Sequence, residues 1–159
     1  MIFVTIGTQL PFDRLIKAAD EAVARRGLKG FAQIGPGNYL PAHLTHERFV
    51  TADKFEELIA ASSCIVSHAG MGSIITAMRY GKPAILMPRS AALGEHRNEH
   101  QLATARRFSE HPSVRIVNSS DEILAAYDDI LDRSASVPFD LSPHATAELI
   151  DAMRAMVFK

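Results

Sequence analysis

The sequence predicts an α/β fold with a mostly parallel sheet and helices on both faces. Short apolar runs such as Ile2–Ile6 and Ala84–Met87 are typical of strands buried on both faces. Stretches of helical periodicity alternate with these runs along the chain, as they do in parallel sheets. Glycine or proline stands at most of the changes from one to the other.

The first half of the chain carries two predicted helices between its strands. Strands are expected there over residues 2–6, 31–34 and 48–50. Pro11 opens a helical pattern that Gly27 stops. Asp53 is the predicted cap of the next helix, because Glu56 follows at the spacing of a capping box.

The second half repeats this alternation. Strands are expected over residues 64–67, 84–87 and 114–117. The first leads into a helix to Tyr80, where Gly81 and Pro83 form a typical stop.

Two further helices are predicted after the loop over residues 88–97. One begins at Asn98, and the other is capped by Ser119 and Glu122. Beyond it, residues 134–159 are expected to form a C-terminal extension and a last helix.

Composition and charge narrow the possible functions. The 17 Lys+Arg and 18 Asp+Glu leave a net charge of −1, which argues against a protein that coats nucleic acid or anionic lipid. The one cysteine, Cys64, excludes a disulfide framework and a cysteine-based zinc site. No apolar run approaches the roughly 18 residues of a membrane span, and residues 1–7 do not match a secretion signal. We expect one cytoplasmic domain over residues 1–159.

Ligands of open parallel sheets bind beyond the carboxyl ends of the strands. The loops at that edge are expected over residues 7–10, 35–38, 67–73 and 88–98. The candidate site residues of this sequence fall in these loops or directly after them.

The turn over residues 67–73 is rich in small residues. Gly70, Gly72 and Ser73 let a ligand approach the backbone, and the helix that follows offers free N–H groups and its positive dipole end. The spacing matches neither a dinucleotide fingerprint nor a Walker loop. Gly7 and Thr8 form a second such turn, and the two together favour a diphosphate. The alternative is structural, with a tight turn at one place and a capping hydroxyl at the other.

The densest polar cluster surrounds the predicted helix start at Asn98. From His96 to His100 it matches the HxxEH pattern of inverted zinc peptidases, although a cap at Asn98 would place His96 outside the helix. Gln101 is expected either to pair with Asn98 as a cap or to bind sugar hydroxyls. His68, beside the glycine turn, is expected to contact a phosphate, to transfer a proton or to be a structural histidine.

Four motifs resemble the C-terminal domain of family 28 glycosyltransferases, in that family's order and spacing. They are residues 3–9 (FVTIGTQ), 67–74 (SHAGMGSI), 81–83 (GKP) and 100–103 (HQLA). Within the family, the chain is most similar to the stand-alone small subunits of two-component UDP-sugar transferases. The loop over residues 94–98 resembles that of the bacterial exopolysaccharide branch more than that of the eukaryotic dolichol-linked branch.

The resemblance implies a Rossmann-like domain equivalent to the C-terminal half of a GT-B glycosyltransferase, the half that binds the UDP-sugar donor. The implied reaction inverts the anomeric centre as an acceptor hydroxyl attacks and UDP leaves, with no metal or other cofactor. His68 is the candidate catalytic residue. The candidate nucleotide and diphosphate ligands are Gly7, Thr8, Gly70, Gly72, Ser73 and Thr76. The candidate donor-sugar ligands are Glu95, His100 and Gln101.

One position departs from the family pattern. Relatives usually hold the ribose hydroxyls with an acidic residue three positions after the serine of the glycine turn, where this chain has Thr76. A threonine lacks the bidentate geometry of a carboxylate, and Glu95 or Glu99 is the candidate substitute. Arg89 and Arg97 lie in the loop where a glucuronate donor would need a cation.

We therefore expect the donor-binding catalytic subunit of a transferase in exopolysaccharide assembly. Its expected partners are the UDP-sugar donor and a membrane-anchored subunit that binds a polyprenyl-diphosphate-linked saccharide, with no nucleic acid and no membrane span of its own. The expected location is cytoplasmic, at the inner face of the membrane through that partner. The alternative is a non-catalytic accessory subunit, which Thr76 favours.

Overall fold

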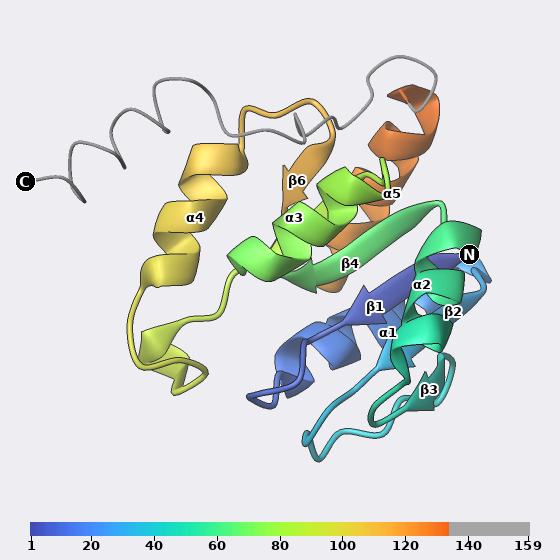
Figure 1. Ribbon diagram of the computed structural model, residues 1–159, viewed down its shortest axis with the longest axis horizontal. Helices are drawn as coiled ribbons and strands as arrows, with labels where there is room; N and C mark the ends of the chain where they lie inside the picture. Colours follow the sequence, from blue (N-terminus) through green and yellow to red (C-terminus); the bar gives the residue numbers. More distant parts are fainter. Residues whose placement is uncertain (134–159) are drawn as a thin grey trace, which may run out of the picture.

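The computed structural model describes residues 1–133. The extension and last helix expected over residues 134–159 lie outside the described residues. Figure 1 shows one twisted sheet through the middle of the described part, with helices on either side of it.

All six strands are parallel and form one sheet in the order β3-β2-β1-β4-β5-β6. The strands are β1 (Ile2–Thr5), β2 (Gly30–Gln33), β3 (Thr45–Glu47), β4 (Cys64–His68), β5 (Ala84–Met87) and β6 (Val114–Ile116). The helices are α1 (Asp13–Arg26), α2 (Ala52–Ala61), α3 (Met71–Arg79), the 3-10 helix η1 (Ala91–Leu93), α4 (His100–Phe108) and α5 (Ser120–Arg133). The predicted α/β class with a parallel sheet is confirmed.

Two apolar cores cover the two faces of the sheet. On one face, α1 and α5 pack against strand residues such as Val4 and Val66. On the other, α2, α3 and α4 pack against residues such as Phe3 and Ile65. Successive strand residues point to opposite faces, so every residue of β1 is buried and its sequence shows no polar alternation.

The third strand was predicted wrongly over residues 48–50, since β3 is Thr45–Glu47. It pairs with β2 at the edge of the sheet, for example Thr45 with Phe31. Two of its three residues are exposed, so this edge strand carries polar side chains and lacks the apolar run on which the prediction depended.

Two helix starts also differ from prediction. The cap of α2 is Thr51, whose Oγ1 accepts a hydrogen bond from the N–H of Lys54, and Asp53 lies within the first turn, where its charge suits the helix dipole. The helix α4 begins at His100. Asn98 lies before it and accepts a bond from the His100 N–H through Oδ1.

Other predicted helix ends are confirmed. Gly27 ends α1 in the left-handed conformation, with φ 65°. Before α5, the Ser119 hydroxyl accepts from the N–H of Glu122, whose carboxylate accepts from the N–H of Asn118.

The order of the strands locates a crevice. The chain moves outward from β1 to β3 and then returns to the other side of β1 as β4, so the loops that follow β1 and β4 leave the sheet edge in different directions. Ligands of such sheets bind at this switch point. Within residues 1–133, no helix is long and apolar enough to cross a membrane.

Candidate functional site

Two cavities meet at the switch point between β1 and β4. The larger, here called groove A, has a volume of about 540 Å³ and is lined from β2, α2 and α3. The smaller, here called pocket B, has a volume of about 300 Å³ and lies against the segments 6–10 and 89–101. Gly7, Thr8 and His68 line both cavities and therefore form their junction.

The start of α3 presents backbone donors to groove A. The first bond within the helix runs from the Ile74 N–H to the Gly70 carbonyl, which leaves the preceding N–H groups of the first turn available. Gly72 and Ser73, in that turn, line the groove. A Cβ at Gly72 would meet no described atom within 4 Å. The open backbone and the positive end of the helix dipole suit an anion.

The other two glycines of the predicted site enclose the imidazole of His68. A Cβ at Gly70 would lie 2.5 Å from His68 Nε2, and a Cβ at Gly7 would lie 3.2 Å from His68 Cε1. Gly7 also has φ +76°, which residues with a side chain rarely adopt. These glycines therefore make room for a histidine of the protein itself, in addition to any ligand.

Two serines determine which nitrogen of the neutral His68 ring carries the proton. The Ser67 hydroxyl lies 2.7 Å from the Thr5 carbonyl oxygen and 2.9 Å from the Ser73 hydroxyl. A carbonyl only accepts and a hydroxyl has one proton, so Ser67 donates to Thr5 and Ser73 donates to Ser67. Nδ1 of His68 lies 3.3 and 3.4 Å from the two hydroxyl oxygens and must then be the donor. Nε2 consequently holds the free lone pair, on the ring edge beside the glycine turns.

His68 is neutral near pH 7. Burial, together with the charges of Arg89 and His96, lowers the pKa of His68 from 6.5 to about 4. A negative charge beside the ring would raise this pKa, because it favours the imidazolium. The ring can therefore take up a proton when negative charge develops next to it.

Arg89 and Gln101 build the wall of pocket B. The guanidinium of Arg89 is buried and donates to carbonyls of the loop over residues 6–11, so it is not the free cation expected for a glucuronate. Gln101 is buried as well, and its Oε1 accepts from the Arg89 N–H at 3.1 Å, so it does not form the predicted cap with Asn98. In the described part of the chain its amide nitrogen has no protein acceptor and can donate to a ligand.

Glu95 is engaged within the protein. Its carboxylate accepts two bonds from Arg14, at 2.7 and 2.8 Å, and one from the Ser90 N–H at 2.9 Å. Burial alone would raise the pKa of Glu95, but these donors outweigh it and the pKa is lowered. Glu95 lines a third cavity, of about 490 Å³, between its own loop and the start of α1.

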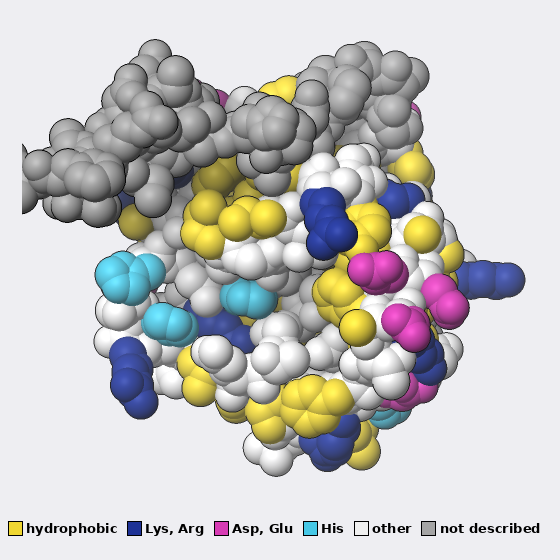
Figure 2. All heavy atoms as spheres, viewed as in Figure 1, with side chains coloured by type: hydrophobic (Ala, Val, Ile, Leu, Met, Phe, Trp, Pro, Cys, Tyr) yellow, Lys and Arg dark blue, Asp and Glu magenta, His cyan; other side chains and the backbone are white. Residues whose placement is uncertain are grey.

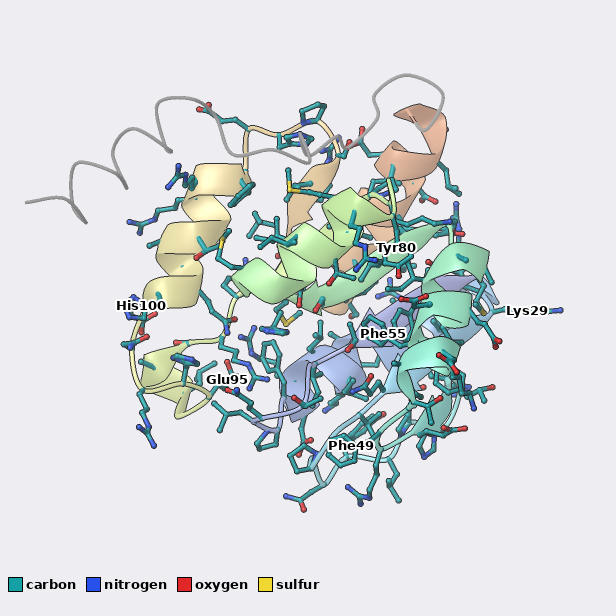
Figure 3. The ribbon with its side chains drawn as sticks, viewed as in Figure 1. Lys29, Phe49, Phe55, Tyr80, Glu95 and His100 are labelled. Atoms are coloured by element: carbon teal, nitrogen blue, oxygen red, sulfur yellow. The ribbon has the colours of Figure 1, made fainter. Side chains whose placement is uncertain are left out.

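The two histidines of the HxxEH pattern have different surroundings. His96 lines pocket B, whereas His100 is exposed at the start of α4, where Figure 3 labels it beside the lower end of the helix. Because α4 begins at His100, His96 does not share a helix face with it. Among the described residues, no group of three or more His, Cys, Asp or Glu side chains is arranged to hold a metal.

Sequence reasoning missed the floor and the apolar wall of groove A. Gln33, the last residue of β2, is 4% exposed, and its Oε1 has no partner among residues 1–133. A buried acceptor of this kind needs a donor from a ligand or a water. Phe55 and Tyr80 line the same groove from α2 and from the end of α3 (Figure 3). The position of Gln33 at the end of a strand was the one available signal.

Comparison with known proteins identifies the family. The model of the glycosyltransferase family 28 C-terminal domain matches residues 1–141. The UDP-N-acetylglucosamine transferase subunit ALG13 of Homo sapiens is 30% identical over 118 residues, which are 67% of this chain and 10% of that protein. ALG13 of Yarrowia lipolytica is 27% identical over 112 residues, 62% of this chain and 57% of that protein. The chain thus spans only part of these relatives.

Solved structures share the fold. An NMR solution structure of ALG13 has a TM-score of 0.61 at 19% identity, covering 89% of both chains. The calicheamicin glycosyltransferase CalG4 has a TM-score of 0.63 at 18% identity, over 84% of this chain and 35% of that one. MurG of Acinetobacter baumannii has 0.59 at 16%, over 83% and 41%. The predicted Rossmann-like fold of GT-B glycosyltransferases is confirmed, and the chain belongs to the glycosyltransferase family 28 C-terminal domain family.

Proposed function

We propose that this chain binds a UDP-sugar and is the donor-binding catalytic subunit of an inverting glycosyltransferase. The observation that carries the proposal is the junction of groove A and pocket B at Gly7, Thr8 and His68. Groove A, with backbone donors and an apolar wall, suits a nucleoside diphosphate. Pocket B, with the amide of Gln101 and the ring of His96, suits a hexose. A donor that fills both cavities has its diphosphate at the junction.

The reaction needs a base for the acceptor and stabilisation of the leaving diphosphate. In the proposed step the acceptor oxygen bonds to the anomeric carbon, the bond from that carbon to the diphosphate breaks, and UDP leaves with the electron pair. The acceptor attacks from the side of the anomeric carbon opposite the diphosphate, and its proton passes to a base on that side. The N–H groups of Gly72 and Ser73 stabilise the departing charge, and that charge raises the pKa of His68, which takes up a proton from solvent and stabilises the diphosphate further.

The remaining predicted ligands take different roles in this proposal. Thr8 and Thr76 line groove A and offer hydroxyls to the nucleotide. Glu95 acts indirectly, because it holds the loop after β5 against Arg14. His100, exposed at the start of α4, adds a donor at the outer rim of the sugar site.

We assign the acceptor to a second protein. The relatives that this chain matches are transferase subunits by name. The proposed partner is membrane-anchored, binds a polyprenyl-diphosphate-linked saccharide of exopolysaccharide assembly, and thereby holds this chain at the inner face of the membrane. The loop over residues 94–98, which resembles the bacterial branch, supports this setting.

Calorimetric titration of the full chain with UDP tests the donor site. We expect Thr8→Val to weaken UDP binding about threefold to tenfold, because it removes one hydrogen bond to the diphosphate. Thr45→Val, on the exposed edge strand outside both cavities, is the matched control. Absence of UDP and UDP-sugar binding by the unaltered chain, alone and with the partner, would refute the proposal.

A non-catalytic accessory role is the second candidate, and Thr76 in place of the family acid favours it. The two differ in the effect of His68→Ala on the assembled transferase. A catalytic subunit should lose most of its turnover while still binding UDP. Full turnover with that variant would favour the accessory role.

A further inference from the structure

Groove A presents different polar groups at its two ends. At one end the first turn of α3 presents the N–H groups of Gly72 and Ser73. At the other end the groove is lined by Glu56 of α2 and by Arg79 and Tyr80 at the end of α3. Tyr80 lies seven positions after Ser73, so the two ends lie about 10 Å apart along the helix axis. This length and polarity match a ligand with an anionic group at one end and hydroxyl donors further along.

Glu56 is the one carboxylate among the described residues that line groove A. Figure 2 shows acidic side chains gathered over α2 on the face that contains the groove. Glu95 and Glu99, the candidates from the sequence, are engaged elsewhere, with Arg14 and with the N–H of Ala91 respectively. Thr76, on the opposite wall, offers a single hydroxyl.

Tyr80 lines groove A together with Glu56. Its hydroxyl is close enough to Glu56 for hydrogen bonding to raise the pKa of Tyr80. The ring is itself held at the groove by the Arg79 guanidinium, 5.6 Å from its centroid. An exposed glutamate has many rotamers, so a fixed donor on one oxygen reduces the entropy lost when a ligand binds to the carboxylate.

We propose that Glu56 binds the ribose hydroxyls of the nucleotide, as a positioning residue on the wall opposite Thr76. This inference rests on the proposed function and specifies its nucleotide site. A carboxylate is an acceptor with two oxygens, and neighbouring 2′- and 3′-hydroxyls are two donors at matching separation.

The test compares UDP with 2′-deoxy-UDP as ligands of the full chain. We expect Glu56→Gln to weaken UDP binding about tenfold. The substitution removes the charge and replaces one of the two carboxylate oxygens with an NH₂ group, so one of the two hydroxyls loses its acceptor. The affinity for 2′-deoxy-UDP should change less than about twofold on the same substitution. That ligand has no 2′-hydroxyl and therefore needs only one acceptor oxygen at this position. Tyr80→Phe should weaken UDP about twofold to threefold by releasing Glu56. Glu57→Gln, adjacent on α2 and outside the groove, is the control and should bind both ligands normally.

Three results would overturn the inference. One is equal binding of UDP by Glu56→Gln and the unaltered chain. Another is an equal loss for UDP and 2′-deoxy-UDP, which would indicate a general effect on the groove. The third is tighter UDP binding by the variant, which would show that Glu56 only repels the diphosphate. In all three the unaltered chain still binds UDP, whereas failure of the proposed function would abolish binding to the unaltered chain.

Discussion

Asp20 shows how a single carboxylate organises a segment that the sequence leaves undefined. It is 2% exposed and accepts bonds from the N–H groups of Ala42, His43 and Leu44 and from the Tyr39 hydroxyl, all at 2.8–3.0 Å. We expect Asp20→Asn to lower the free energy of unfolding by on the order of 2–3 kcal/mol, since an amide cannot accept at both positions. Glu21→Gln, exposed next to it, is the control for urea denaturation, and equal stability of both variants would contradict this account.

Asp20 also makes stability depend on pH. Burial would raise its pKa, but the backbone donors of residues 42–44 and the Tyr39 hydroxyl outweigh it, and the pKa is lowered from 3.8. The unfolded chain therefore takes up the proton first as the pH falls. The stabilisation is present above pH 3.8 and is lost as the pH drops below it towards the folded value.

His68 offers a second titration that can be measured directly. Its ring should titrate by NMR near pH 4 in the free protein, because burial disfavours the imidazolium. UDP should raise the midpoint, since the diphosphate lies beside the ring in our proposal. Between pH 6.5 and about 4 the unfolded state binds more protons, so stability should fall on acidification. A His68 midpoint unmoved by saturating UDP would place the diphosphate elsewhere.

At the scale of elements, Arg89 joins β5 to the loop after β1. Its guanidinium donates to the carbonyls of Ile6, at 3.2 Å, of Leu10, at 2.9 Å, and of Pro11, and it lies 4.6 Å from the ring centroid of Phe12. These bonds fix the turn that contains Gly7 and Thr8, between groove A and pocket B.

Replacing Arg89 should therefore affect stability and ligand binding together. A lysine keeps the charge but cannot donate to several carbonyls in the plane of a guanidinium, so Arg89→Lys should cost about 2–4 kcal/mol of stability. Amides of residues 7–10 should exchange faster with deuterium, and UDP binding should weaken. Arg97→Lys, at an exposed position, provides the comparison. Protection of the 7–10 amides as strong as in the unaltered chain would show that the loop does not depend on Arg89.

The elements differ in how far the sequence predicts them. Buried strands such as β1 and β5 are visible because both faces need apolar residues. The edge strand β3 is polar and depends on pairing with β2, which no local pattern encodes. The same distinction holds in the site. The glycine turn is a local motif, whereas the Arg14–Glu95 pair joins residues 81 positions apart, and the enclosure of His68 by Gly7 and Gly70 depends on two strands being neighbours.

At the scale of the whole molecule, strand order explains why the candidate ligands come from distant parts of the chain. The loops after β1 and β4 diverge at the switch point, and the segment after β5 closes pocket B beside them. Parallel strands place all of these loops at one edge, which is why a site at this edge was predictable without knowledge of any contact. The identity of each side chain's partner was not, because it depends on how α2 and α3 face each other across groove A.

In our proposal the donor site at the carboxyl ends of the strands belongs to this chain, and the acceptor site belongs to a second protein. The purified chain should bind UDP with the same affinity alone and with the proposed partner, because we assign the whole nucleotide site to groove A. Transfer of sugar from a labelled UDP-sugar to a polyprenyl-diphosphate-linked saccharide should rise by about a hundredfold or more with the partner, since orientation of the acceptor contributes factors of this size or greater. Glu57→Gln should change neither quantity. Equal transfer with and without the partner would place the acceptor site on this chain, and UDP binding that appears only in the complex would divide the donor site between the two proteins.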